Sequence, residues 1–298
     1  MTALYEYFAK MAGILPAPSN IETTEFEDGF SNRVYLIHWD QVPQLVLRVP
    51  NIDCTAFYIN RSDEINTLKF AASAGLSPRV VWHDEFGAVA CDFVNQPSLD
   101  WAVVHQDKDI IRIAQALTKA HCLPISEHEY LVFDVIEHYL KMIKHHGVND
   151  SSVCAEYEYL HAIFEQLDRP AALLPPVLCH NDLNPKNFLM DNKKLWLIDW
   201  EYSGTGDALF DLAVIAKSHN LDDRQVALLV DSYQPGLPME EALEVITDYV
   251  EAYGLREMAW LLLKHLLTPE DTISLEYYYE FKTTPSLNPF LGIKQLKL

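Results

Sequence analysis

Three oxygen-bearing side chains stand between residues 178 and 201 at a spacing that suits phosphoryl transfer. Asp182 is followed five residues later by Asn187, and Asp199 ends the apolar run 195–199. Transfer of a phosphoryl group to a hydroxyl needs a carboxylate that orients the hydroxyl and accepts its proton, together with oxygen ligands for Mg²⁺. Pro185 favours a turn that lets the carboxylate and the amide flank one site. The three side chains together therefore indicate a phosphoryl-transfer site.

The same order of residues occurs in protein kinases, where an Asp, an Asn five positions later and a metal-binding Asp after a strand form the site. Asp and Asn are also common in turns, so each of these residues taken alone would more often be structural. The combined spacing, followed by WEYSGTGDALFDLA (200–213), favours the catalytic interpretation.

The segments HNDLNPKNFL (180–189) and IDWEYSGTGDALFDLA (198–213) resemble the choline/ethanolamine kinase group of the aminoglycoside-phosphotransferase-like superfamily. The resemblance covers nearly the whole chain. It implies an α+β, two-lobed protein-kinase-like fold, with a small antiparallel-sheet N-lobe and a larger, mainly helical C-lobe. It also implies ATP and Mg²⁺ as cofactors, Asp182 as catalytic base, and Asn187 and Asp199 as magnesium ligands. His180 and Asp211 are expected to be structural, with Asp211 bracing the catalytic loop.

The first lobe carries further matches to this group, all on the nucleotide side. GFSNRVY (29–35) is similar to the group's Gly–x–x–Asn–x–x–Tyr stretch over the nucleotide phosphates, although one glycine makes a poor phosphate loop. Arg48 stands where a protein kinase has its strand lysine, and a guanidinium can hold two phosphate oxygens. Glu64 is its expected ion-pair partner, the alternative being an exposed helix residue. The resemblance implies a nucleotide-binding set of Ser31, Asn32, Arg48, Glu64, Asp92 and Val94.

The acceptor side is expected among aromatic and acidic residues of the second lobe. A quaternary ammonium is held by aromatic faces and nearby carboxylates. The resemblance implies a substrate-binding set of Asn184, Glu201, Tyr202, Trp260 and Tyr277. The alternative is that these aromatic side chains belong to the hydrophobic core. The group typically has two tryptophans three residues apart near the C-terminus, and this chain has only Trp260 there, which weakens the case for choline.

The amino-acid composition limits the kinds of binding partner that we expect. The 298 residues carry a net charge of -21, which disfavours nucleic acid and anionic membranes and would attract a cationic substrate. The five cysteines are scattered without a CxxC pair, which indicates a reducing compartment. No secretory signal or membrane-spanning run is evident. We therefore expect a cytoplasmic protein, monomeric or homodimeric, whose partners are ATP and a small cationic alcohol.

The elements that must position the site divide near residue 95. Residues 1–95 are predicted to form the nucleotide-binding lobe, which contains a short N-terminal helix, strands at 33–39, 44–49, 79–83 and 87–94, and a helix at 60–74. Residues 96–298 are predicted to form the helical lobe with the catalytic loop and acceptor pocket. Its predicted helices are 108–122, 133–146, 153–167, 222–233, 239–253 and 255–267, with one inserted hairpin at 187–199.

Three function hypotheses remain open at this point. The leading one is a kinase of a small cationic alcohol, choline first and ethanolamine next, with a thiamine kinase-like enzyme as a close alternative. An aminoglycoside-type phosphotransferase would use the acidic residues between 240 and 251, which one charged helix face explains equally well. A non-catalytic pseudokinase scaffold is the third, because a fold alone does not prove activity.

Overall fold

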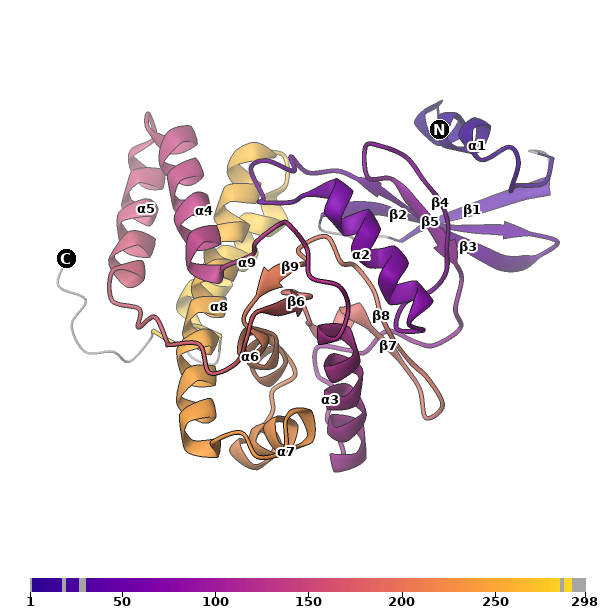
Figure 1. Cartoon of the computed structure of the whole chain (residues 1–298). Helices are drawn as coiled ribbons and strands as arrows, with labels where there is room; N and C mark the ends of the chain where they lie inside the picture. The colour runs from indigo at the N-terminus through magenta and orange to yellow at the C-terminus, as the bar shows by residue number, and fades with distance from the viewer. Residues whose placement is uncertain (1, 18–19, 27–30, 285–286, 291–298) are drawn as a thin grey trace.

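The structure is a computed structural model that describes residues 2–17, 20–26, 31–284 and 287–290 (Figure 1). Gly29 and Phe30 of the predicted phosphate-covering segment lie outside the described residues. The described chain forms a strand-rich lobe followed by a larger helical lobe. The predicted two-lobed α+β fold is confirmed. None of the described helices is long and apolar enough to span a bilayer.

The first lobe is built on an antiparallel sheet in the order β1-β2-β3-β5-β4. Its strands are β1 (Ile21–Phe26), β2 (Asn32–Trp39), β3 (Val42–Pro50), β4 (Val80–His83) and β5 (Val89–Asp92). Asp40 and Gln41 have positive φ angles of 54° and 61° and form a two-residue hairpin turn, so β3 begins earlier than predicted. Strand β1 was not predicted; five of its six residues are exposed.

Two helices accompany this sheet. The chain after α1 (Thr2–Lys10) packs Met11 and Leu15 against Ile37 and Leu47 of the sheet. Helix α2 (Arg61–Ser73) is capped by the Asn60 side chain and is followed by a left-handed glycine that lets the chain reverse. Its buried side includes two charged residues, Arg61 and Glu64, besides apolar ones. These two charges therefore point into the protein rather than into solvent.

The second lobe is mainly helical and contains two short two-stranded sheets. Its helices are α3 (Asp107–His121), α4 (Val132–Gly147), α5 (Ser151–Phe164), α6 (Ala208–Ser218), α7 (Asp223–Tyr233), α8 (Met239–Leu267) and α9 (Thr272–Thr283). Strand β6 (Val177–Cys179) pairs with β9 (Gly204–Gly206), and β7 (Phe188–Met190) pairs with β8 (Leu195–Leu197). The β7–β8 hairpin was predicted, and the β6–β9 pair was not.

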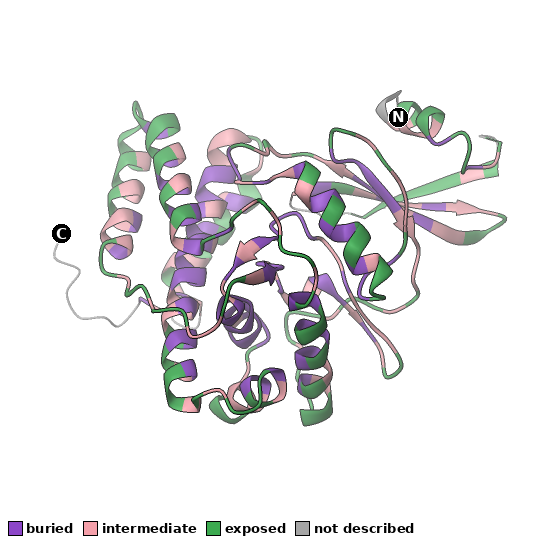
Figure 2. Cartoon of the chain, in the orientation of Figure 1, coloured by how far each residue is buried: buried purple, intermediate pink, exposed green. Residues whose placement is uncertain are grey.

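Helix α8 departs from the prediction because it is continuous through Gly254, where two helices were expected to meet. Glycine weakens a helix interior by about 1 kcal/mol, and tertiary packing readily overrides that preference. Packing also explains the glycine, since a Cβ atom there would lie 3.0 Å from Cδ and Cγ of Pro289. Helix α6 was not predicted as a helix; it is buried along almost its whole length (Figure 2). Both helices supply residues to the site.

Candidate active site

Asp211 fixes the backbone of the loop that follows β6 and carries Asp182. The Asp211 carboxylate, on buried helix α6, accepts the N–H of His180 at 2.8 Å and of Asn181 at 2.7 Å. Asn181 has a positive φ of 65°, a conformation that costs free energy in a non-glycine residue and persists where the surroundings enforce it. The His180 ring donates from Nε2 to the carbonyl of Ile198 at 2.9 Å and lies against Trp200. Both residues predicted as structural thus lie beneath the loop.

Asp182 and Asn187 are brought together by the short 3-10 helix Pro185–Asn187. The Asn187 amide donates to the carbonyl of Asp182 at 2.7 Å and to its Oδ2 at 2.9 Å. Asn184 donates to the same Oδ2 at 3.2 Å. Burial raises the pKa of Asp182 to about 6, and the guanidinium of Arg256 opposes that rise. The carboxylate is therefore held in one orientation by two amides and is more basic than an exposed aspartate.

The β7–β8 hairpin brings Asp199 close to Asn187. The Ile198 N–H donates to the Asn187 carbonyl at 3.0 Å, which ties the two predicted metal ligands to neighbouring strand ends. Asp199 has a positive φ of 63°, and its side chain is 30% exposed. Its Oδ1 lies 2.5 Å from Nη1 of Arg48, so a cationic group already faces this carboxylate. Glu64 pairs with the other terminal nitrogen of Arg48.

Glu201 was predicted to bind the substrate, but its side chain is almost completely buried. It is 2% exposed and accepts hydrogen bonds from Arg61 and Asn32, both at 3.0 Å. Arg61 also donates to Glu64 at 2.8 Å. Burial, and then the nearby Asp199, raises the pKa of Glu201 to about 7, against the pull of the two guanidinium groups. The Glu201 carboxylate thus joins the two lobes through Asn32 of β2 and Arg61 of α2.

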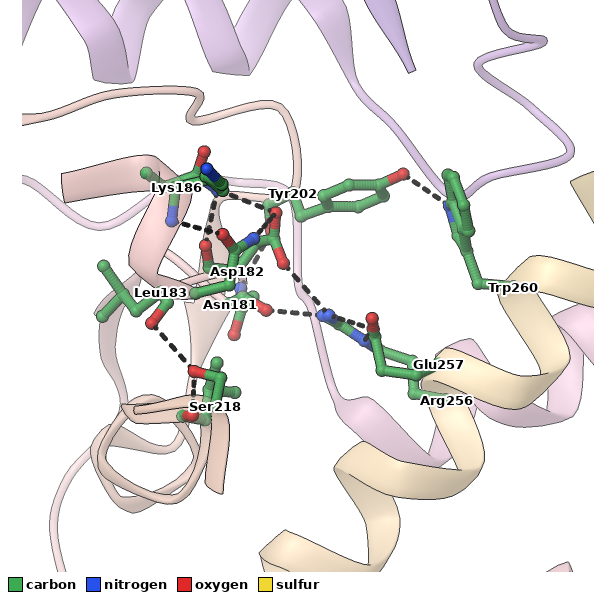
Figure 3. Close-up of polar contacts among 12 residues, drawn as sticks. Asn181, Asp182, Leu183, Lys186, Tyr202, Ser218, Arg256, Glu257 and Trp260 are labelled. Carbon is green, nitrogen blue, oxygen red and sulfur yellow. Dashed lines mark hydrogen bonds and ion pairs between the residues drawn. The ribbon is translucent and has the colours of Figure 1, made fainter. Parts of the chain in front are cut away.

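The sequence analysis missed Arg61 and Arg256. Arg61 stands three residues before Glu64, a helical spacing that the sequence does show. Arg256 carries no such signal, because its hydrogen-bond partners among the described residues are 74 or more positions away, except for the adjacent Glu257. From α8 it donates to the Asn181 carbonyl at 2.5 Å and to Asp182 Oδ1 at 3.3 Å (Figure 3). It also donates to Tyr130 Oη at 3.1 Å.

The aromatic residues predicted for the acceptor side separate into two groups. The Trp260 Nε1–H donates to the hydroxyl of Tyr202 at 2.7 Å, so these two side chains meet (Figure 3). Tyr277 lies on α9 and is 45% exposed. Its neighbour Tyr278 is buried and donates to Glu156 at 2.5 Å. The structure therefore brings Tyr202 and Trp260 together and leaves Tyr277 on an exposed side of its helix.

The remaining residues predicted to bind the nucleotide lie at or just beyond the ends of β2 and β5. The Ser31 carbonyl accepts the N–H of Asn51 at 3.2 Å, just before β2. Asp92 ends β5, and its carboxylate accepts two hydrogen bonds from Arg79, at 2.8 and 3.1 Å. Val94 follows in the chain between the lobes, and its backbone N–H and C=O bond to no other backbone group among the described residues.

A sheet-containing lobe, followed by a helical lobe whose loop 180–187 carries Asp182 and Asn187, defines a protein-kinase-like fold. The Phosphotransferase enzyme family matches residues 22–245, and the chain belongs to this family. Protein LicA of Haemophilus influenzae is 28% identical over 211 residues, which cover 69% of this chain and 60% of that protein. A probable ethanolamine kinase of Arabidopsis thaliana is 27% identical over 252 residues, covering 76% of this chain and 67% of that protein.

A solved structure has a similar fold. The crystal structure of choline kinase LicA from Streptococcus pneumoniae matches with a TM-score of 0.72 over 95% of this chain and 98% of that chain, at 21% identity. At this identity the likeness concerns the fold alone. The predicted family is confirmed.

Proposed function

We propose that the chain is an ATP-dependent kinase that phosphorylates the hydroxyl of a small cationic alcohol, choline or ethanolamine. The observation that carries the proposal is the convergence of Asp182, Asn187 and Asp199 opposite the Arg48–Glu64 ion pair. These are the parts that phosphoryl transfer needs on the acceptor, metal and phosphate sides. Relatives described as LicA and as a probable ethanolamine kinase support this choice of acceptor.

Asp182 is proposed to orient the acceptor hydroxyl and take its proton. Its Oδ2 is held by the amides of Asn184 and Asn187, and its Oδ1 faces Arg256. A side chain fixed by three donors loses little freedom when the hydroxyl arrives, which favours a productive orientation. The raised pKa of Asp182 makes it a better proton acceptor than an exposed aspartate at the same pH, once it is ionised.

The donors beside the base fit Mg²⁺. Asn187 and Asp199 offer the hard oxygen atoms that Mg²⁺ prefers, and the Asp199 carboxylate is partly exposed and already faces a cation, Arg48. Bound there, Mg²⁺ would neutralise the charge of the transferring phosphate. Arg48 is proposed to hold phosphate oxygens, with Glu64 fixing its guanidinium.

The nucleotide is proposed to lie between the sheet and the catalytic loop. Ser31 and Asn32 stand at the start of β2, on the proposed phosphate side. The backbone groups of Val94, which bond to no other backbone group among the described residues, are suited to the adenine edge. The boundary between the lobes is proposed near residue 95, between the end of β5 and the start of α3.

An ADP-release assay on the purified chain tests the proposal. We expect turnover with choline or ethanolamine, and none with thiamine or an aminoglycoside. Asp182→Asn, which preserves shape but removes the base, should lower kcat by about 10²- to 10⁴-fold and leave ATP binding intact. ATP binding without turnover of any of these alcohols would show that the chain is a non-catalytic scaffold, and turnover of an aminoglycoside alone would assign it to that acceptor class.

A further inference from the structure

The aromatic rings beside the base already face cations of the protein itself. The Arg256 guanidinium lies 5.8 Å from the ring centre of Tyr202 and 5.1 Å from that of Tyr253. The ammonium of Lys264 lies 5.7 Å from the Trp260 ring, which also packs against Phe57 at 5.5 Å. A quaternary ammonium is recognised by several aromatic faces turned toward it. Part of that aromatic surface is already occupied here by resident cations and a neighbouring ring.

Glu257 offers a different kind of cation site in the same place. It lies on α8 one turn before Trp260, and its side chain is 27% exposed. Arg256 donates to its Oε1 from Nε at 3.1 Å and from Nη2 at 2.7 Å. Among the described residues no hydrogen bond reaches its Oε2. One carboxylate oxygen is therefore anchored, and the other remains to receive a hydrogen-bond donor.

Arg256 links this carboxylate to the base. The same nitrogen, Nη2, contacts Oε1 of Glu257 at 2.7 Å and Oδ1 of Asp182 at 3.3 Å (Figure 3). The two carboxylates are thus separated by no more than two hydrogen-bond lengths. The single positive charge of Arg256 faces the two negative charges of Asp182 and Glu257, so one further positive charge would make the group neutral. A short alcohol with its hydroxyl and ammonium on adjacent carbons supplies this charge and offers a hydroxyl to Asp182.

We propose that Glu257 is the specificity-determining residue of the acceptor site, with its Oε2 accepting an N–H from the substrate's ammonium group. Arg256 is a positioning residue that keeps this carboxylate beside Asp182. The preferred acceptor is then a primary amino alcohol, which has N–H donors, rather than a quaternary one, which has none. This inference rests on the proposed kinase function and refines its acceptor.

Stepwise N-methylation of the acceptor tests the inference on the unaltered chain. We would measure kcat/KM with Mg-ATP for ethanolamine, its N-methyl and N,N-dimethyl derivatives, and choline. The last methyl group removes the last N–H, so the largest drop should fall at choline. Loss of one charged hydrogen bond predicts a drop of about ten- to a hundredfold. Choline used as well as ethanolamine, or better, would overturn the inference while leaving the kinase proposal intact.

The substitution Glu257→Gln tests the contribution of the negative charge of this side chain. Glutamine keeps an oxygen acceptor for Arg256 but loses the charge, so the preference for ethanolamine over choline should shrink by about tenfold or more, mainly through KM for ethanolamine. Glu158→Gln, on the exposed side of α5, is the matched control and should change neither value. An equal loss for both alcohols would mark Glu257 as merely structural and refute its role in specificity. No turnover of any alcohol in the series would instead reject the kinase proposal, and this inference with it.

Discussion

Replacing Glu201 with Gln is expected to stabilise the metal-free protein at pH 8, although it removes one partner of a buried ion pair. Glu201 is almost fully buried and accepts a hydrogen bond from Arg61. The surrounding cluster contains two guanidinium groups, of Arg48 and Arg61, and three carboxylates, of Glu64, Asp199 and Glu201. The charges balance when one carboxylate is neutral, and Glu201 is the most deeply buried apart from the doubly paired Glu64.

The pKa values give the size and sign of the effect. Burial raises the pKa of Glu201 from an ordinary 4.5 to about 7, so the folded state binds this proton more tightly than the unfolded state. The free energy of unfolding therefore falls as the pH rises from 4.5 to 7, and it remains reduced above pH 7. The gap between the two pKa values corresponds to about 3 kcal/mol. Gln mimics the neutral acid, so the gain should approach this value at pH 8 and vanish near pH 4.

Urea unfolding of both proteins in the presence of EDTA at pH 5 and pH 8 measures the difference. The stabilisation should be several times larger at pH 8 than at pH 5, and Glu158→Gln should show no pH-dependent difference. If the ion pair with Arg61 outweighed the burial of its charge, the variant would instead lose about 3–5 kcal/mol at pH 8. That outcome would refute the reasoning, because it would place the folded-state pKa of Glu201 below its ordinary value.

Two further substitutions test the surroundings of Asp182 and the packing of α8. Arg256→Met removes the shared cationic partner of Asp182 and Glu257, and should lower the free energy of unfolding by about 3–5 kcal/mol in urea denaturation; an unchanged denaturation midpoint would contradict this. Gly254→Ala should lower the melting temperature, since overpacking against Pro289 costs about 1–3 kcal/mol and a helical alanine returns only about 1 kcal/mol. A variant that melts higher than the wild type would show that Pro289 moves aside without cost.

Much of the catalytic loop could be read from the sequence because its geometry is local. Asp182 and Asn187 lie five residues apart around Pro185, and a short turn leaves few ways to arrange them. Asp199 follows on the partner strand of a hairpin, a connection that is also short in the chain. Residue type and spacing were therefore enough to predict a phosphoryl-transfer site, and the resemblance of these segments to a known group supplied the family and the kinase-like fold.

Contacts between residues that lie far apart in the sequence could be identified only from the tertiary structure. Arg256 and Asp182 are 74 residues apart in the sequence, and Arg61 and Glu201 are 140 apart. No local sequence pattern predicts either contact. The exposure of Tyr277, the burial of Glu201 and the continuity of α8 likewise follow from which surfaces pack together. The sequence by itself was enough to predict which groups would perform the chemistry, because short loops bring them together. Only the folded chain decided which charges surround those groups, because burial and long-range contacts set both the pKa values and the acceptor side of the site.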